Sequence, residues 1–478
     1  MPDGGRPRLE LPRNRRGEKP VSDVIPPRTL SGFRDYLPSV MLAREEILRR
    51  VREVYRSYGY TPIDTPACEA LDILLGKGGE ESDKLIYRVR SAKGEKEEMG
   101  LRFDLTVPFA RFAAQYLNQF GLPFKRYAMG PVWRGERPGQ GRYREFWQCD
   151  FDIIGTMSNA ADIEVALVIH DLLLALDVQR FAIHINSRLL LNGWLAQQGL
   201  QDQAVPLLRA LDKLPKIGRD KVAEEMIRAA QVSSAQAEQV LRLAELRGSS
   251  TELLDRVQAE FASPVPPLAQ EGLRRLRELL EVVHAVGVPP ERIVIDLSIC
   301  RGLDYYTGTV YETFLTDLPG IGSICSGGRY DNLAGKYTRQ VLPGVGASLG
   351  LDRLVAALEE LHHPLLNQRH TPAEVLIVQF DAERLADYQR LARQLRAAGV
   401  AVEVYPEAKK IGQQLSYAEK RGLRCALIAG SEEFARGLWK IKDLSRRVET
   451  TVPAAAVVEA VQAVLRSPPC DGAGAKSA

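Results

Sequence analysis

Arginine side chains gather in one short stretch of the sequence, around a turn rich in proline and glycine. Residues 125–144 carry six cations, Lys125, Arg126, Arg134, Arg137, Arg142 and Arg144, against one acid, Glu136. Guanidinium groups bind phosphate oxygens in pairs, and the rings of Phe146 and Trp147 follow at once. A solvated basic hairpin would explain the charge but not these rings. The pattern therefore favours a hairpin that binds a phosphate and stacks on a purine base.

Polar residues also interrupt the apolar segment after this turn. Asp150 and Asp152 alternate with Phe151, so they are expected on one face of a strand with Gln148. Acids on an otherwise apolar strand need partners, such as a ligand ammonium or an arginine.

A second group lies in SICRGLDYYTGTVYE, where Arg301 ends a predicted apolar strand before Gly302. An arginine that leaves a sheet at this point can reach a phosphate. A structural Arg–Asp pair with Asp304, beside core tyrosines, explains the same residues equally well.

Three further segments carry candidate residues. In GLRFDLTVPFARF, Asp104 and Thr106 are predicted on one face of a strand, where Asp104 could receive an ammonium or serve a turn. In SGGRYDNLAGKY, the glycine pair before Tyr330 allows close backbone approach or simply a turn. In GLDRLVAAL, Arg353 lies near a predicted helix start and alone is typical of an exposed helix cation.

Common catalytic motifs are absent from the sequence. It contains no GxxxxGK[ST] phosphate loop, no GxGxxG after a strand and no GxSxG elbow. The six histidines, at 170, 184, 284, 362, 363 and 370, fall outside the segments above, which argues against histidine as a general base. Any ATP would have to bind on an antiparallel sheet through arginines.

The elements that must position these residues follow from periodicity. Helical spacing predicts a helix over 41–58, and strands are expected at 85–89, 101–105, 124–134, 144–155 and 181–186, with a helix at 160–176. Successive strands joined by turns predict an antiparallel sheet with flanking helices, an α+β domain. Residues 190–285 read as a helical insertion, and strand character returns from 292. Residues 374–466 alternate strands and helices as a separate α/β unit.

Composition narrows the class of protein. A chain of 478 residues suggests about three domains. It has 45% hydrophobic and 26% charged residues, and no apolar run of membrane-spanning length, which excludes a membrane protein. The net charge of +3 neither requires nor excludes nucleic acid. The six cysteines form no CxxC pair, which predicts reduced thiols and a cytoplasmic protein. Residues 1–26 and 467–478 are expected to be disordered tails, the first of them basic.

These segments together resemble the class II histidyl-tRNA synthetases. Residues 41–69, with Pro66, resemble class II motif 1; GPVWRGERP…GRYREFWQCDFD resembles motif 2; and GVGASLGLDRL resembles motif 3. RGLDYYTGTVYE and SGGRYDNLAGKY resemble two segments peculiar to the histidine enzyme. The resemblance extends over about 27–466 and is loosest in the insertion.

The resemblance implies an organisation and a reaction. It implies a class II catalytic domain at 27–365, the helical insertion at 190–285 within it, and an anticodon-binding domain at 373–466. Histidine and ATP would give histidyl-adenylate, and histidine would then pass to the 3′ end of its tRNA. Mg²⁺ would be held mainly through the ATP phosphates. The partners implied are L-histidine, ATP, the tRNA for histidine and a second copy of the chain in a homodimer.

The resemblance also implies roles for individual residues. Arg134 and Arg301 would be catalytic, gripping the α-phosphate from two sides. The residues implied for histidine are Asp104, Leu105, Thr106, Arg134, Gln148, Asp152, Arg301, Tyr305, Tyr306 and Tyr330. Those implied for ATP are Arg134, Glu136, Arg142, Phe146 and Arg353, with adenine between Phe146 and the stem of Arg353.

Two positions depart from the family pattern: Gly135 stands where a basic or polar residue is common, and Trp147 where His or Tyr is common. The main alternative is a catalytically silent regulatory relative that binds histidine. Such relatives usually lack the C-terminal domain and catalytic arginines, whereas Arg134, Arg301, Arg353 and residues 374–466 are all present. A synthetase for threonine, proline or glycine is disfavoured by RGLDYY.

Overall fold

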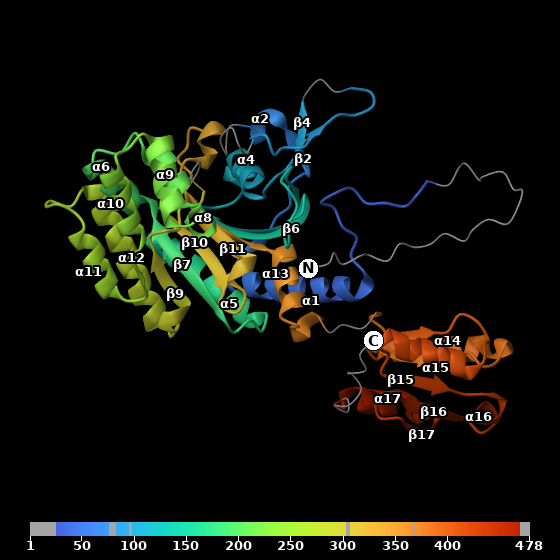
Figure 1. The fold of residues 1–478 in the computed structure, drawn as a ribbon. Coiled ribbons are helices and arrows are strands. Elements are labelled where there is room, and N and C mark those ends of the chain that lie inside the picture. Colours follow the sequence, from blue (N-terminus) through green and yellow to red (C-terminus); the bar gives the residue numbers. More distant parts are fainter. Residues whose placement is uncertain (1–24, 76–82, 95–97, 303–305, 367–369, 469–478) are drawn as a thin grey trace, which may run out of the picture.

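The chain folds into two parts, each with its own sheet and core (Figure 1). The computed structural model describes residues 25–75, 83–94, 98–302, 306–366 and 370–468. Among these residues, the clusters of buried apolar side chains lie either before residue 367 or after residue 372, and none spans both sides. The C-terminal unit is therefore held together by contacts of its own. No helix in the described ranges is long and apolar enough to cross a membrane.

A nine-stranded sheet forms the centre of the larger part. Its strands, in order across the sheet, are β1 (Thr61–Pro62), β5 (Phe124–Trp133), β6 (Glu145–Ile154), β12 (Gly344–Gly350), β11 (Cys325–Tyr330), β10 (Thr309–Leu315), β7 (Phe181–Ser187), β9 (Ile293–Asp296) and β8 (Arg247–Gly248). Only β1–β5 and β7–β9 are parallel pairs among them. The predicted antiparallel sheet is confirmed.

Strand alternation divides β6 between two environments. Cys149, Phe151 and Ile153 belong to the main core, beneath α1 (Pro38–Ser57) and α5 (Asn159–Ala175). The Tyr55 ring of α1 lies 5.0 Å from the ring of Phe151, and its hydroxyl donates to the Cys149 carbonyl at 2.8 Å. Because side chains alternate along a strand, Gln148, Asp150 and Asp152 face the other side.

A second layer covers that other side of the sheet. It contains α4 (Thr106–Tyr116), α2 (Leu71–Leu74) and a small sheet of β2 (Cys68–Ala70), β4 (Met99–Leu101) and β3 (Arg88–Val89). Phe109 of α4 packs in a cluster with Ile154 of β6 and Tyr330 of β11. The polar side chains of β6 are thus enclosed between sheet and helix.

Helices fill most of residues 188–285 and form the green end of the molecule in Figure 1. They are α6 (Arg188–Gln197), α7 (Ala204–Leu211), α8 (Leu214–Ile217), α9 (Arg219–Ala230), α10 (Ser234–Ala244), α11 (Thr251–Ala259) and α12 (Pro267–Ala285). The two-residue strand β8 lies among them and pairs with β9, so this segment also extends the main sheet. After β12, α13 (Leu351–Glu360) returns to pack on β6.

The C-terminal unit is the predicted α/β fold. Its sheet has the order β14 (Val402–Val404), β13 (Val375–Ile377), β15 (Cys425–Ile428), β16 (Leu438–Asp443) and β17 (Val448–Pro453). Its helices are α14 (Leu385–Ala397), α15 (Ile411–Arg421), α16 (Ser431–Ala435) and α17 (Val457–Arg466). Strands and helices alternate along most of this unit, as the sequence predicts.

Candidate functional site

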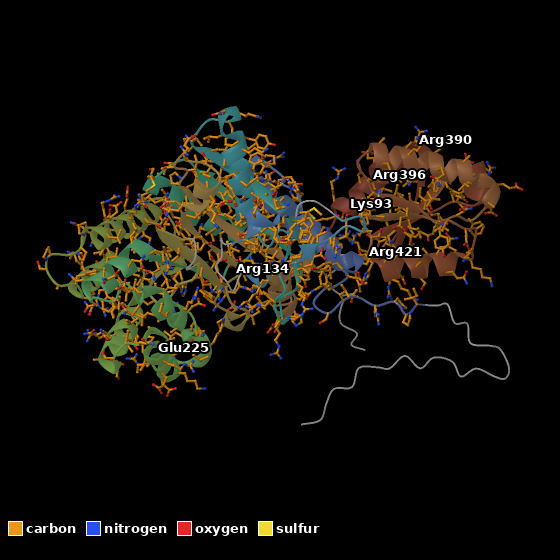
Figure 2. The ribbon with its side chains drawn as sticks, turned by 90° about the horizontal axis from the view of Figure 1, so that it is seen from above. Lys93, Arg134, Glu225, Arg390, Arg396 and Arg421 are labelled. Atoms are coloured by element: carbon orange, nitrogen blue, oxygen red, sulfur yellow. The ribbon has the colours of Figure 1, made fainter. Side chains whose placement is uncertain are left out.

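A cleft of about 530 Å³ opens where the β5–β6 turn, β12, α13 and the helical insertion meet. It is lined by Arg134, Glu136, Gly141, Arg142, Tyr143, Phe146, Gln148, Asp212, Lys216, Arg301, Ser323, Ile324, Ser326, Ser348, Gly350, Asp352 and Arg353. Seven of the residues predicted from the sequence are in this set. Figure 2 labels Arg134 within the larger part of the molecule.

The arginines of the β5–β6 turn are held by backbone and by one acid. Arg134 Nε donates to the Phe103 carbonyl at 2.9 Å, and its guanidinium lies 5.1 Å from the centre of the Phe146 ring. Glu136 lies between two guanidinium groups, with Oε1 3.7 Å from Arg134 Nη1 and Oε2 3.4 Å from Arg142 Nε. A single carboxylate thus orients two cations toward one space.

Arg353 adds a cation from the opposite wall. It lies in the first turn of α13, and its Nη1 donates to the Ser323 carbonyl at 2.7 Å. Burial lowers the pKa of Arg353, and the charges of Arg142 and Arg301 lower it further. Cations crowded in this way favour a polyanionic ligand, which would relieve their mutual repulsion.

Arg301 is fixed by two acids that the sequence analysis did not select. Its Nε lies 2.7 Å from Glu312 Oε1, on β10, and 3.5 Å from Asp212 Oδ1, in the insertion. Burial raises the pKa of Glu312 to about 7, while Arg301 opposes that rise. Glu312 could have been found in the sequence, because it is the one acidic residue in the apolar segment TVYETFL. Arg301 itself lies beyond the strand rather than at its end, because β9 stops at Asp296.

A buried polar network lies next to the cleft on the enclosed side of β6. The sequence prediction that Asp150 and Asp152 share a face is confirmed, and their partner is Arg126 on β5. Arg126 Nη2 lies 2.6 Å from Asp152 Oδ2 and 3.9 Å from Asp150 Oδ2. Tyr330 donates to Asp152 Oδ1 at 2.5 Å. Gln148 belongs to both regions, because its amide donates to Ser348 Oγ in the cleft at 2.9 Å.

Several atoms of this network have unused hydrogen-bonding capacity. Arg126 Nε and Nη1, Gln148 Oε1 and Asp150 Oδ1 are buried without a hydrogen-bond partner among the described residues. Buried polar atoms normally have partners, so these four indicate room for a polar ligand. Burial raises the pKa of Asp150 and of Asp152, and a cationic ligand would favour their charged forms.

Asp104, Leu105 and Thr106 do not form the predicted strand. The strand ends at Leu101, and Thr106 begins α4. Asp104 Oδ1 accepts from the Val107 backbone N–H at 2.9 Å, so the carboxylate binds an otherwise unpaired donor at the helix start. Pro108 favours this outcome because proline fits the first turn of a helix. Thr106 still reaches the network, with Oγ1 3.4 Å from Asp150 Oδ2.

The tyrosines occupy the far side of the polar network. Tyr330 is buried in the cluster of α4, and Tyr306 packs against the same cluster. The alternative of a simple turn at the glycine pair is wrong, because Gly327 and Gly328 lie inside β11. A Cβ on Gly328 would lie 2.8 Å from Tyr306 Cδ1, so glycine is required for this packing. Tyr305 and Asp304 fall outside the described residues.

Trp147 and Gly135, the two departures from the family pattern, are each held by a backbone hydrogen bond. The Trp147 backbone N–H donates to Asp352 Oδ2 at 2.6 Å, which ties the β6 entrance to α13. The Gly135 N–H donates to the Leu85 carbonyl at 2.8 Å. Both contacts use the backbone, so neither depends on the side chain at that position.

The arrangement joins two chemistries in one site. The cationic cleft suits a nucleotide. The buried polar network of Arg126, Gln148, Asp150, Asp152 and Tyr330, named the chamber below, suits a small amphoteric molecule. Gln148 lies where the two meet. Such a site can bring a carboxylate against a phosphate and stabilise the charge that develops.

Comparisons with known proteins agree with this geometry. The family profile described as histidyl-tRNA synthetase matches residues 32–354, and that described as anticodon binding domain matches residues 374–464. A histidine–tRNA ligase from Rhodopirellula baltica is 52% identical over 445 residues, covering 92% of this chain and 99% of the relative. One from Treponema denticola is 42% identical over 454 residues, covering 93% and 99%. The crystal structure of histidyl-tRNA synthetase from Nostoc sp. superposes with a TM-score of 0.82 at 35% identity, covering 92% of this chain and 100% of the other.

Proposed function

The chain belongs to the histidyl-tRNA synthetase family, and we propose on that basis that it ligates histidine to its tRNA in two steps within this site. Histidine and ATP first give histidyl-adenylate and pyrophosphate. The histidyl group then passes to the terminal ribose of the tRNA for histidine, and AMP leaves. The observation that carries the proposal is that a buried polar chamber on β6 adjoins a cleft lined by Arg134, Arg301 and Arg353.

Histidine would occupy the chamber. The unpaired atoms of Arg126, Gln148 and Asp150 would bind its amino group and ring nitrogens. Asp152 and Tyr330 would fix the orientation of that ligand through the bond between them. The residues proposed to form the chamber with these are Asp104, Leu105, Thr106, Tyr305 and Tyr306.

ATP would occupy the cleft. Phe146 and the stem of Arg353 would enclose adenine, and Glu136 and Arg142 would border the nucleotide. Arg134 would hold the α-phosphate and the histidine carboxylate together, and Arg301 would approach the same phosphate from the insertion side. Arg353 and Arg142 would neutralise the departing phosphates.

The chemical step then needs little proton transfer. A histidine carboxylate oxygen attacks the α-phosphorus, a mixed anhydride forms, and the bond to the β-phosphate breaks. Because the carboxylate is already ionised, no general base is required. The barrier falls through positioning and through arginine contacts that strengthen as charge builds on the phosphate.

Mg²⁺ would enter with ATP. The described residues contain no group of three or more metal-ligating side chains. The cleft carboxylates Glu136, Asp212 and Asp352 are each already paired with an arginine. This donor set fits an ion whose ligands are mainly phosphate oxygens. Bound in that way, Mg²⁺ would neutralise charge on the outgoing pyrophosphate.

We propose that the protein acts in the cytoplasm as a homodimer. Ile25, Leu30 and Leu37 are exposed by 86%, 72% and 71% of their surfaces and lead into α1. In a homodimer, a second copy of the chain would cover these exposed apolar side chains. Sedimentation at micromolar concentration checks the assembly, and a monomer alone would contradict it. The described cysteines are free thiols, in keeping with a reducing compartment.

Charging of tRNA tests the whole function. The purified protein should attach labelled histidine to unfractionated tRNA in an ATP-dependent reaction, and should attach neither threonine, proline nor glycine. Histidine binding without charging would instead indicate a regulatory relative. Charging with another amino acid would assign a different synthetase.

A further inference from the structure

The helical insertion reaches the active cleft at one corner. Between α7 and α8 the chain turns, and Asp212 and Lys216 from this corner line the cleft beside Arg301. The neighbouring apolar side chains Leu208 and Leu211 are buried in the core, which anchors the corner. The insertion is therefore part of the wall of the site.

Asp212 of the insertion pairs with Arg301 beside Glu312 of the sheet. Its Oδ1 lies 3.5 Å from Arg301 Nε, and Glu312 Oε1 lies 2.7 Å from the same atom. The side chain of Glu312 is only 6% exposed, whereas those of Arg301 and Asp212 are 38% and 32% exposed. Arg301 is thus fixed by a rigid acid of the sheet and a more accessible acid of the insertion.

The two acids make their closest approach to Arg301 at the same atom. The shortest distance of each carboxylate from the guanidinium is to Nε. A guanidinium held at Nε presents its two terminal nitrogens in a fixed fork, the geometry that binds phosphate oxygens. Arg301 lies beyond β9 and is not part of a strand, so these ion pairs must fix its direction.

Lys216 supplies a cation from the same corner. Its side chain is exposed and lines the cleft with Arg142, Arg301 and Arg353. Lys213, three residues earlier, pairs instead with Glu225, which Figure 2 labels on the insertion. The two lysines are thus neighbours with different surroundings, one facing the cleft and one engaged within the insertion.

We propose that Asp212 and Lys216, at this corner of the insertion, complete the phosphate side of the active cleft. Asp212 is a positioning residue that aims Arg301 at the α-phosphate. Lys216 contacts the outgoing phosphates of ATP. This inference rests on the proposed function, and it assigns to the insertion a part in the first chemical step.

Substitution of Asp212 tests the positioning role. In histidine-dependent pyrophosphate exchange, D212A and D212N should lower kcat about tenfold, because a misaimed group loses rate rather than binding. The KM for histidine should stay within about twofold, and D212E should recover most of the rate. In an R301A background, D212A should cause no further loss. A rate for D212N within twofold of wild type, or a full additional loss in the R301A background, would overturn the role.

Substitution of Lys216 tests the phosphate contact. K216A should raise the KM for ATP about tenfold, as expected when a charged hydrogen bond to the ligand is lost. K213A removes the same charge nearby and should leave the KM within about twofold of wild type. Equal KM values for the two variants would overturn the contact. The wild-type protein is measured in the same assay. If it shows no exchange with histidine, the proposed function fails, whereas normal wild-type exchange with unaffected variants contradicts only the roles of Asp212 and Lys216.

Discussion

At the scale of the residue, the site is organised by arginines whose charges are only partly balanced. Arg126 is completely buried and shared by Asp150 and Asp152, whereas Arg353 has its pKa lowered by burial and by neighbouring cations. The ion pairs of Arg126 hold the chamber rigid, whereas the excess positive charge around Arg353 favours the binding of an anion. A bound nucleotide would reduce that excess of positive charge.

Arg301→Ala is expected to reduce adenylate formation about 10²-fold or more, because a preorganised charge that stabilises the transition state is removed. Histidine binding should be largely kept, since Arg301 lies in the cleft and not in the chamber. Single-turnover kinetics together with histidine calorimetry would separate the two effects. A rate within a few fold of wild type would remove Arg301 from the mechanism.

Glu312→Gln is expected to change how stability depends on pH. Burial raises the pKa of Glu312 from 4.5 to about 7, so between these values the folded protein holds a proton that the unfolded chain releases. The stability this provides is full below 4.5 and is lost as pH rises through 7. Melting temperatures measured by calorimetry from pH 5 to pH 8 should therefore fall less steeply for E312Q. Parallel curves for the two proteins would contradict this pKa.

The sequence predicted the residues of the site better than their partners. Seven predicted residues line the cleft because the motifs that carry them are local in the chain. The acids at Arg301 could not be found in this way, since Asp212 and Glu312 come from different elements and meet only in the fold. The partner of Asp150 and Asp152 was expected to be an ammonium or an arginine, and Arg126, from the neighbouring strand, fills that place.

At the scale of the element, β11 and β12 pair so closely with their neighbours that glycine is needed on both faces of the sheet. A Cβ on Gly327 would lie 2.6 Å from Ala347 Cα, and a Cβ on Gly346 would collide with Asp152. The glycines thus let two strands and a buried acid share a narrow space. Elements with strong periodicity, such as α5 and β6, agree with the sequence prediction. The strand predicted over 101–105 ends at Leu101 instead, because the chain turns there into α4, which begins at Thr106.

Gly327→Ala is expected to lower the melting temperature by several degrees, because overpacking a close-packed core costs about 1–3 kcal/mol. Gly335→Ala is the matched control, since a Cβ there meets nothing within 4 Å. Calorimetry of both variants measures the difference. Equal melting temperatures would show that β11 and β12 separate easily, and the packing argument would fail.

At the scale of the whole molecule, the chain consists of two parts with separate cores (Figure 1). The larger part contains the cleft and the chamber. The C-terminal unit matches the anticodon-binding profile over residues 374–464. The presence of both parts was predictable, because residues 374–466 alternate strands and helices as a separate unit of the sequence. Their separate cores could be established only from the folded structure.

Deletion of residues 373–478 is expected to weaken tRNA charging far more than histidine activation. Among the described residues, none beyond Arg353 lines the cleft, so the activation rate should stay within about twofold of the intact protein. Parallel assays of charging and pyrophosphate exchange measure the two steps. Equal losses in both would assign the C-terminal unit to stability instead.

The central claim is that this site activates histidine with ATP. The most direct test is exchange of labelled pyrophosphate into ATP by the intact protein, with histidine and with each other amino acid in turn. The proposed chamber and cleft predict exchange with histidine alone. Absence of exchange, with histidine still bound in calorimetry, would contradict the claim and leave the arginines of the cleft without a catalytic role.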